Sequence, residues 1–497
     1  MIEITLADEA ATIRAGNDVA AALKPGDAVA LHGDLGTGKT TLARAIIRSL
    51  AGDFGLEVPS PTFTLVQSYN GRLPAAHFDL YRIAHADEVR ELGLDEALAE
   101  GVALIEWPER AGVYLPETTI HVKLLEDSDG RRLTMDGPKS ALTRLERSFA
   151  IRSFLGSSGT SEAVRGYLAG DASTRSYETV DAGGGRALLM NAPRMPDGPA
   201  IRDGKPYSQI AHLAESVIPF VAIDTALRAN GFCAPDILGA DLEAGFLLIE
   251  DLGRDGLLDA EGRPIVERYQ ASAELLADMH RAKWQLQVQV DASSTHHVPA
   301  YDRSAMAIET ELLIDWYLPY ATGSNPTQTD RSEFSAIWSR LFDRLESADK
   351  SLVLRDYHSP NIIWRGDKTG NDRVGIIDFQ DALIGPSAYD VASLALDARV
   401  TISQKLEEAV KRAYVKARSD AAFDAASFDE AYAIMAAQRN SKIVGIFVRL
   451  NKRDGKPHYL KHLPRIRDYL DRATRHPALA ELREFYLRMK VLPEGAV

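Results

Sequence analysis

The sequence predicts two domains of different class, an α/β domain at the N-terminus and a larger α+β domain after it. The first observation is length, because 497 residues are about three times a typical domain. The second is an apolar strand, a glycine-rich turn and an amphipathic helix in direct succession at residues 27–50. The third is that the later part of the chain contains both kinds of segment, such as the apolar strand FLLIE (246–250) and LLADMHR (275–281), which has a helical period.

The boundary between the domains is predicted near residues 136–143. Turn formers and charged residues mix over residues 126–144, and the apolar residues of LERSFAIRSFL, which follow, recur at helical spacing. We therefore expect the first domain to span residues 1–138 and the second to span residues 143–497.

Composition and charge exclude several classes of protein. The chain is 45% hydrophobic and 26% charged, as globular proteins are, which excludes intrinsic disorder. The net charge is −14, and the first 150 residues, with 15 basic and 23 acidic ones, contribute −8 of it. This acidity disfavours direct binding of nucleic acid. The single cysteine, Cys233, cannot form an intramolecular disulfide. Without a leader or a run of about 18 apolar residues, we expect a cytoplasmic protein that does not span a membrane.

The strongest functional motif is a phosphate-binding loop in the first domain. Glycines in such a loop let backbone N–H groups turn toward phosphates at a helix N-terminus. The lysine would reach the β- and γ-phosphates of ATP, and the hydroxyl of Thr40 would bind Mg²⁺. The pattern G-x-x-x-x-G-K-[ST] and the threonine after it predict these nucleotide-binding residues: Gly33, Asp34, Leu35, Gly36, Thr37, Gly38, Lys39, Thr40 and Thr41.

A phosphate loop needs a carboxylate at the end of a neighbouring strand to hold Mg²⁺. Glu106 ends the apolar strand VALIE and is the better candidate, for catalysis and for the metal, whereas Asp79 ends a shorter apolar run. Ser60 and Thr62, between the loop and these strands, are either sensors of the γ-phosphate or simple turn residues.

Four ordered motifs, GDLGTGKTT, SPTFTLV, HFDLYR and LIEWPER, resemble the TsaE family of ATPases over about residues 1–135. The resemblance implies ATP hydrolysis in support of tRNA threonylcarbamoyladenosine synthesis, together with the partner proteins TsaD and TsaB. It also implies that tRNA is contacted only indirectly, through these partners, which fits the acidic charge. By position, Asp79, Glu106 and Trp107 fall where the family has functional residues.

The second domain carries three residues in the order that phosphoryl transfer to a hydroxyl requires. Asp356 and Asn361 lie five apart in VLRDYHSPNIIW, and Asp378 ends the following apolar strand, VGIID. A carboxylate at Asp356 would orient the hydroxyl and accept its proton. Asn361 and Asp378 would hold Mg²⁺.

Two upstream segments predict the ATP side of this second site. A turn between two strands at residues 167–180 would cover the phosphates with backbone N–H groups and the hydroxyl of Ser173. The strand FLLIE ends at Glu250, where the backbone from Glu250 to Leu252 would bind adenine.

The order of these motifs resembles the aminoglycoside phosphotransferase family of two-lobed, protein-kinase-like enzymes, with lobes at about residues 143–253 and 254–497. RALLMNAP, GPSAYDVASL and GIFVRLNKRDGKPHYLKHLPR resemble its AmgK branch. The resemblance implies phosphorylation of the anomeric hydroxyl of N-acetylmuramate and N-acetylglucosamine during cell-wall recycling. Met190 stands where related kinases have an ATP-binding lysine, so Arg175, Arg194 or Lys205 would replace that cation.

The acceptor site is the least defined part of the sequence. Arg439, Lys442 and Arg449 predict a basic rim for the carboxylate of an acidic amino sugar, although a solvated helix face would look the same. Three alternatives stay open for the second domain. These alternatives are a kinase that phosphorylates hydroxyls of aminoglycosides or other small molecules, a protein kinase, and a nucleotide-binding scaffold without turnover.

Overall fold

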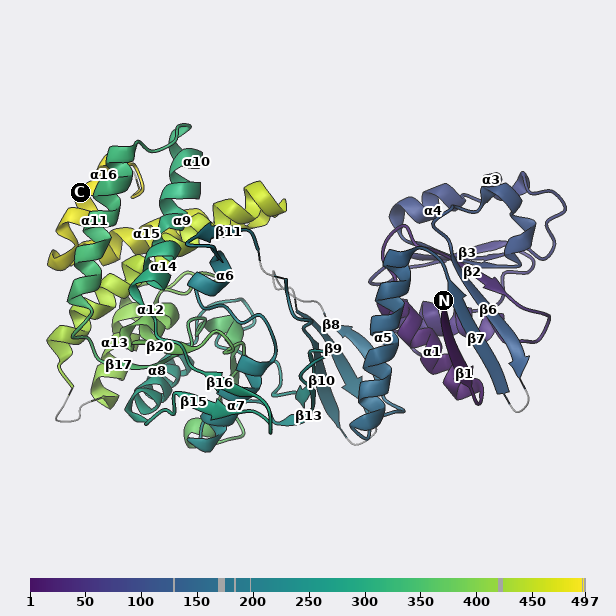
Figure 1. Cartoon of the computed structure of the whole chain (residues 1–497), viewed down its shortest axis with the longest axis horizontal. Helices are drawn as coiled ribbons and strands as arrows, with labels where there is room; N and C mark the ends of the chain where they lie inside the picture. The colour runs from purple at the N-terminus through teal and green to yellow at the C-terminus, as the bar shows by residue number, and fades with distance from the viewer. Residues whose placement is uncertain are drawn as a thin grey trace. The chain divides into compact units, whose positions relative to one another are not determined.

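The structure is a computed structural model that describes residues 1–127, 130–168, 175–182, 185–196, 198–418, 423–493 and 495 (Figure 1). The chain divides into two compact units. The first contains Met1–Ala192 and Ile237–Glu250, and the second contains Pro193–Asp236 and Asp251–Val497. Both large sheets belong to the first unit, whereas the second is mostly helical.

A mixed sheet with the strand order β1-β7-β6-β2-β5-β4-β3 forms the centre of the first unit. Strand β2 is parallel to β5 and β6, and β4 is parallel to β5. Strands β1, β3 and β7 run antiparallel to their neighbours. The strands are β1 (Ile2–Leu6), β2 (Ala28–His32), β3 (Val66–Tyr69), β4 (Ala75–Asp79), β5 (Val102–Glu106), β6 (Ile120–Asp127) and β7 (Gly130–Asp136).

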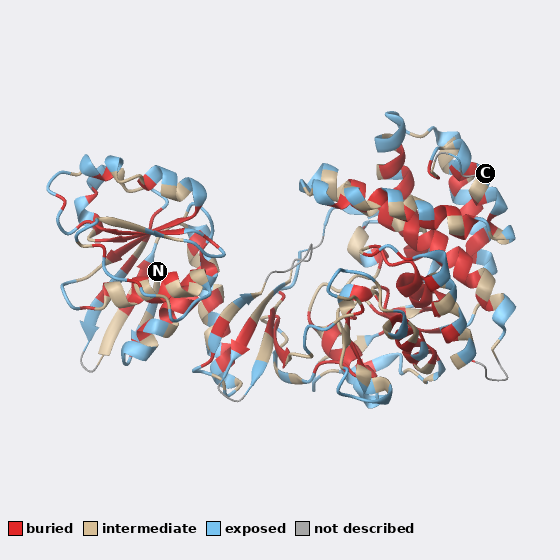
Figure 2. Cartoon of the chain, turned by 180° about the vertical axis from the view of Figure 1, so that it is seen from behind, coloured by how far each residue is buried: buried red, intermediate tan, exposed pale blue. Residues whose placement is uncertain are grey.

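Burial explains why the central strands are unbroken apolar runs. Strands β4 and β5 are buried at every residue, and the centre of this sheet is red in Figure 2. Parallel strands covered on both faces have this pattern. The connections carry α1 (Glu9–Ala22), α2 (Lys39–Ala51), α3 (Glu88–Glu91), α4 (Leu94–Glu100) and the short 3-10 turns η1 (Pro108–Arg110) and η2 (Gly112–Tyr114).

Helices α1 and α2 approach each other closely at Gly16. A Cβ added to Gly16 would lie 2.5 Å from the Cβ of Ala45 in α2. Glycine is therefore required for this packing, which fixes α1 against the helix that begins at the glycine-rich loop.

The predicted boundary segment is partly a hairpin. Strands β6 and β7 pair through residues 120–127 and 130–136, so much of the turn-rich sequence is extended. Helix α5 (Lys139–Ser157) begins soon after β7 and includes the helical segment that the sequence predicts. It packs against α1, and its Phe154 lies against Phe246 with ring centroids 5.7 Å apart.

Phe246 belongs to a second, antiparallel sheet of the first unit, with the order β13-β14-β10-β9-β8. Helix α5 thus contacts both α1 and the second sheet. The strands are β8 (Val164–Leu168), β9 (Ser176–Asp181), β10 (Arg186–Asn191), β13 (Ile237–Asp241) and β14 (Phe246–Glu250).

A buried ion network joins α1, α5 and β8. The carboxylate of Asp18 accepts hydrogen bonds from Arg165 at 2.7 Å and from Arg152 at 2.9 and 3.0 Å. Arg165 also binds Glu178 at 2.7 Å, and the hydroxyl of Ser148 donates to the carbonyl of Asp18 at 2.6 Å. Burial alone would lower the pKa of Arg165, but Glu178 and Asp18 hold it well above its usual value. Opposite charges therefore stabilise the junction between α1 and the second sheet.

The second unit is helical, with short hairpins between the helices. The helices are α6 (Tyr207–Ile210), α7 (Ile218–Ala229), α8 (Val266–Arg281), α9 (Arg303–Leu312), α10 (Leu318–Thr322), α11 (Gln328–Arg344), α12 (Ala388–Ala395), α13 (Gln404–Ala417), α14 (Ala425–Asp454), α15 (Leu463–Thr474) and α16 (Ala480–Arg488), with a π-helical turn, η3 (Leu313–Tyr317). The hairpins are β11 (Ala200–Arg202) with β12 (Lys205–Pro206), β15 (Gln287–Gln289) with β16 (Thr295–His297), β17 (Lys350–Val353) with β20 (Leu383–Pro386), and β18 (Ile362–Trp364) with β19 (Val374–Ile376).

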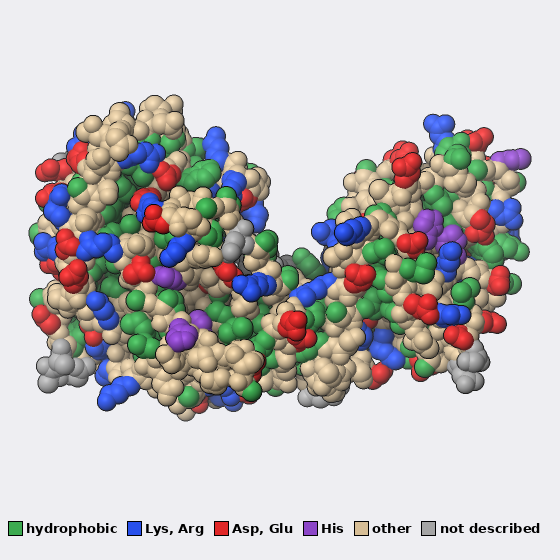
Figure 3. Space-filling model, viewed as in Figure 1, with side chains coloured by type: hydrophobic (Ala, Val, Ile, Leu, Met, Phe, Trp, Pro, Cys, Tyr) green, Lys and Arg blue, Asp and Glu red, His purple; other side chains and the backbone are tan. Residues whose placement is uncertain are grey.

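Helix α14 is the core helix of this unit, because every residue from Ala431 to Ser441 is buried. A helix buried all round lies inside a domain, not on its surface. On the face shown in Figure 3, acidic and basic side chains are interspersed. Within the described residues, no helix combines the length and apolar composition needed to cross a membrane.

Candidate active sites

The loop between β2 and α2 has the backbone geometry of a phosphate cradle. A Cβ added to Gly33 would lie 2.6 Å from the carbonyl oxygen of Leu124, so only glycine fits where β2 enters the loop. Gly38 precedes α2 with a φ of 105° and gives the helix no side-chain cap. The first N–H groups of α2 thus have no capping side chain, and an anion can bind them.

The side chain of Lys39 is folded back onto this loop. Its Nζ donates to the carbonyl oxygens of Gly33 and Asp34 at 2.7 and 2.8 Å and lies 4.0 Å from the centre of the Trp107 ring. Burial lowers the pKa of Lys39, although Glu106 raises it. A bound phosphate would replace two neutral acceptors with a charged one.

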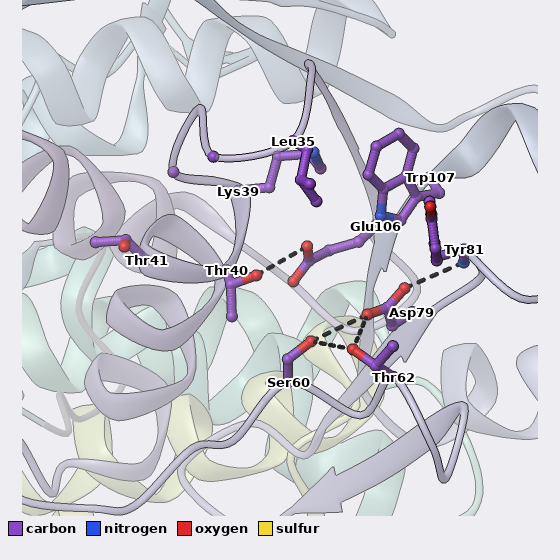
Figure 4. A pocket seen from close by; sticks show the side chains of 12 residues that line it. Leu35, Lys39, Thr40, Thr41, Ser60, Thr62, Asp79, Tyr81, Glu106 and Trp107 are labelled. Atoms are coloured by element: carbon purple, nitrogen blue, oxygen red, sulfur yellow. Dashed lines mark hydrogen bonds between the residues drawn. The ribbon is translucent and has the colours of Figure 1, made fainter.

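Glu106, the last residue of β5, is fixed through both of its carboxylate oxygens. Oε2 accepts a hydrogen bond from the hydroxyl of Thr40 at 3.0 Å (Figure 4), and Oε1 lies 2.9 Å from Nε2 of His77 on β4. Both Glu106 and His77 are buried. The carboxylate therefore stands at the start of α2, next to the loop.

Asp79 lies beside Glu106 because β4 and β5 are parallel and the two residues are register partners. Its Oδ2 accepts from the hydroxyls of Ser60 at 3.0 Å and Thr62 at 2.8 Å, and its Oδ1 accepts from the N–H of Tyr81 at 3.1 Å (Figure 4). Ser60 and Thr62 therefore hold this carboxylate in the structure.

These side chains share one pocket of about 410 Å³. Two carboxylates and a threonine hydroxyl are the oxygen ligands that Mg²⁺ prefers, and they face the loop that would hold phosphates, so the residues fit Mg²⁺ and ATP. Of the predicted loop residues, Gly33, Asp34 and Thr37 do not line the pocket, and Thr37 instead donates to the carbonyl of Asp34 at 2.9 Å. The lining residues are Leu35, Gly36, Gly38, Lys39, Thr40, Thr41, Ser60, Thr62, Asp79, Tyr81, Glu106 and Trp107.

In the second unit, the loop after β17 carries Asp356. The amide of Asn361 donates to the carbonyl oxygen of Asp356 at 2.8 Å and to Oδ2 of Asp378 at 3.3 Å. The β18–β19 pair brings Asn361 and Asp378 together, because one precedes β18 and the other follows β19. Asp378 also accepts from the amide of Gln380 at 2.9 Å. Two oxygen-bearing side chains thus lie beside the backbone of Asp356.

Buried charges hold the backbone of this loop. Asp390 accepts hydrogen bonds from the N–H groups of Leu354 at 2.6 Å and Arg355 at 3.0 Å, and burial raises its pKa to about 7. Arg355 has a φ of 71°, donates to the carbonyl of Ala211 at 2.8 Å and pairs with the buried Glu309. The residue before Asp356 is therefore held in a left-handed conformation by contacts on both its backbone and its side chain.

Arg439 and Lys442 on α14 do not form a solvated helix face, and the role of Arg439, Lys442 and Arg449 in binding the sugar stays a prediction. Arg439 is 3% exposed, and Nζ of Lys442 forms an ion pair with Glu309 at 2.8 Å. Arg449 is half-buried, with its guanidinium 5.2 Å from the centre of the Tyr207 ring. The physical reason is that this part of α14 crosses the core, where charged side chains need buried partners.

Two of these cations act on Asp356 through their charge. Burial raises the pKa of Asp356, but the positive charges of Lys442 and Arg439, together with the neighbouring His358, outweigh it and hold the pKa below its usual value. An ionised carboxylate is what a proton acceptor requires.

The residues predicted to bind the rest of the nucleotide fall in three places. Glu250 ends β14 and is the register partner of Ala187 on β10. Leu252 belongs to the second unit, and its Cδ1 lies 3.0 Å from the position that a Cβ added to Gly375 would take. Ser173 lies outside the described residues. Met190 is buried on β10 and its sulfur accepts the hydroxyl of Tyr177 at 3.3 Å.

Comparison with known proteins assigns both parts of the chain. Residues 6–134 match the family "Threonylcarbamoyl adenosine biosynthesis protein TsaE", and residues 167–428 match the "Phosphotransferase enzyme family". The N-acetylmuramate/N-acetylglucosamine kinase of Caulobacter vibrioides is 36% identical over 355 residues, which are 69% of this chain and 96% of that protein. The TsaE protein of Rickettsia bellii is 44% identical over 115 residues, 23% of this chain and 79% of that protein.

The chain belongs to both families. A kinase of the same name from Pseudomonas aeruginosa is 33% identical over 336 residues, 66% of this chain and 88% of that protein. The predicted fusion of a TsaE domain with an aminoglycoside-phosphotransferase-like kinase domain is therefore confirmed, as are the α/β P-loop and kinase-like fold classes.

Sequence reasoning missed buried polar residues in both domains, and His77 and Glu309 are two of them. The sequence contains a signal for His77 in the TsaE domain, because His77 is the polar residue in the interior of the buried strand AAHFD. A buried polar side chain requires a hydrogen-bond partner. The sequence contains no such signal for Glu309 in the kinase domain, because its partners Arg355 and Lys442 come from distant parts of the sequence.

Proposed function

We propose that the chain is a bifunctional enzyme. The TsaE domain, assigned to residues 1–138, would be an ATPase that supports tRNA threonylcarbamoyladenosine synthesis together with TsaD-like and TsaB-like proteins. The kinase domain, assigned to residues 143–497, would phosphorylate the anomeric hydroxyl of N-acetylmuramate or N-acetylglucosamine with ATP. Both reactions belong to the cytoplasm.

For the TsaE domain, the supporting observation is the convergence of Lys39, Thr40 and Glu106 on one pocket. Lys39 would leave the two loop carbonyls and bind the β- and γ-phosphates. Thr40 and Glu106, with Asp79 beside them, would hold Mg²⁺, which supplies charge neutralisation on the phosphates. Trp107, whose ring centre lies 4.0 Å from Nζ of Lys39, lines the same pocket.

For the kinase domain, the supporting observation is the contact of Asn361 with both Asp356 and Asp378. Asp356 would accept the proton of the sugar hydroxyl as the oxygen attacks the γ-phosphate of ATP. Asn361 and Asp378 would hold Mg²⁺, and Leu252 and Glu250 would contact adenine. Lys442, whose charge acts on Asp356, would place a positive charge near the acceptor, which favours an acidic sugar over a polycationic antibiotic.

The kinase proposal is tested with the full chain and a panel of sugars and one aminoglycoside. We expect ATP-dependent phosphorylation of N-acetylmuramate and N-acetylglucosamine at the anomeric position. Asp356→Ala is expected to reduce this phosphorylation by orders of magnitude without unfolding the protein. Transfer to the aminoglycoside alone, or normal turnover by Asp356→Ala, would refute the assignment.

The ATPase proposal is tested by hydrolysis in the absence of any sugar, with and without TsaD-like and TsaB-like proteins. We expect Mg²⁺-dependent hydrolysis that the partners stimulate and that Lys39→Ala removes. Asp356→Ala serves as the matched control, because it disables the other site and should leave this activity intact.

A further inference from the structure

His77 is a buried polar residue that the mechanism above does not use. It lies in the middle of β4, between Ala76 and Phe78, and is fully buried. Its Nε2 is 2.9 Å from Oε1 of Glu106, while Nδ1 is buried and has no hydrogen-bond partner among the described residues. A buried imidazole without an essential contact would be less favourable here than an apolar side chain.

The contact fixes the arrangement of protons on the ring. An ionised carboxylate oxygen can only accept a hydrogen bond, so Nε2 of His77 must donate to Oε1 of Glu106. Because Nδ1 has no hydrogen-bond partner among the residues that the structure describes, a proton on Nε2 is enough to satisfy the contact. Oε2 of Glu106 is thereby left to face the hydroxyl of Thr40 at 3.0 Å.

We propose that His77 is a positioning residue of the TsaE-domain site. It would hold Glu106 in the orientation in which Oε2 and the Thr40 hydroxyl face the metal position together. This role rests on the proposed Mg²⁺-ATP function of the same pocket. Without the His77 contact, rotation of the Glu106 side chain would no longer be opposed from the strand side, and the carboxylate would lose its orientation toward Thr40.

The geometry of amides supplies a sharp test. The amide nitrogen of glutamine can reach the place of Nε2, whereas the amide nitrogen of asparagine reaches only the place of Nδ1. His77→Gln is therefore expected to preserve the donor to Glu106, and His77→Asn and His77→Leu are expected to lose it. A purely structural role would make asparagine and glutamine similar.

The first measurement is binding of a nonhydrolysable ATP analogue to the full chain by calorimetry, over a range of Mg²⁺ concentrations. An Asp378→Ala background removes the proposed metal carboxylate of the kinase domain. We expect His77→Asn and His77→Leu to need about 10-fold to 100-fold more Mg²⁺ for half-maximal binding, the effect usual for residues that orient metal ligands. His77→Gln should stay near wild type, and binding without Mg²⁺ should be unchanged in all three.

The second measurement is metal-free and reads the contact itself. In nitrogen NMR spectra of the histidine-labelled full chain, His77 should carry its proton on Nε2, and Glu106→Gln should change its ring signals. An Nδ1-protonated ring, or wild-type Mg²⁺ dependence in His77→Leu, would overturn the positioning role. If the wild type bound the analogue equally well with and without Mg²⁺, the proposed metal site would be refuted instead. Lys39→Ala is the control for nucleotide binding itself: if it left binding unchanged, the pocket would not be the nucleotide site.

Discussion

Replacing Asp18 with alanine is expected to destabilise the whole first unit. The variant removes the acceptor of Arg165 and Arg152, whose hydrogen bonds to it range from 2.7 to 3.2 Å. Arg165 keeps Glu178 as a partner, whereas Arg152 loses its carboxylate and, among the described residues, keeps the carbonyl oxygens of Ser161 and Ala163. One positive charge at a largely buried junction thus loses its compensation.

The magnitude follows from burial. Breaking a buried ion pair by removing one partner costs about 3–5 kcal/mol. The Asp18 side chain is 2% exposed but that of Arg152 is 16% exposed, so we expect the lower end, about 3 kcal/mol. For a cooperative unit of roughly 200 residues this corresponds to a fall in Tm of roughly 6–12 °C.

Denaturant and thermal unfolding of the full chain provide the assay. The matched control is Glu162→Ala, because Glu162 also pairs with α1, through Arg14, but its side chain is 72% exposed. Such exposed pairs contribute about 0–1 kcal/mol. If Asp18→Ala destabilised the chain no more than Glu162→Ala does, or if it shifted unfolding of the first sheet without affecting the second, the reasoning would be refuted.

Three further predictions concern single residues. Lys442→Met should raise the pKa of Asp356 and move the acidic limb of the kcat/KM profile of the kinase to higher pH. Lys452→Met is the control, because Lys452 is exposed on the same helix, and it should not move the limb. An unchanged limb in Lys442→Met would contradict the electrostatic role. Burial lowers the pKa of His280 to about 3 from 6.5, so the folded state binds fewer protons than the unfolded state, and stability should fall as pH drops from 6.5 toward 3. His280→Gln should flatten that slope in acid unfolding, and a slope equal to that of wild type would count against the assignment. Gly16→Ala should cost about 1–3 kcal/mol in denaturant unfolding because its Cβ meets Ala45, whereas Gly156→Ala, with 3.9 Å to its nearest neighbour, should be neutral or stabilising.

The sequence was most informative where the chemistry is local. A strand, a glycine-rich loop and a helix follow one another directly around Gly33 and Lys39, so their arrangement depends on few long-range contacts. The β18–β19 hairpin likewise brings Asn361 beside Asp378 through short-range pairing. Such elements can be predicted from spacing alone.

Contacts across the fold were beyond that reasoning. Asp18 and Arg165 are 147 residues apart, so nothing local indicates that they meet. Because charged side chains are usually exposed, the sequence alone places the basic residues of α14 at a surface, as a rim of the acceptor site or as a solvated helix face. Their burial depends on Glu309, which only the tertiary structure brings to Lys442.

The stacking of Lys39 on Trp107 gives the TsaE domain an optical signal of its own. An ammonium group 4.0 Å from the centre of an indole ring perturbs its emission, and phosphate binding would draw that group away. Nucleotide arrival at this pocket can therefore be followed by the fluorescence of Trp107 without a label. Because the other tryptophans, at positions 284, 316, 338 and 364, all lie in the second unit, replacing them would leave a chain that reports on one of its two nucleotide sites alone.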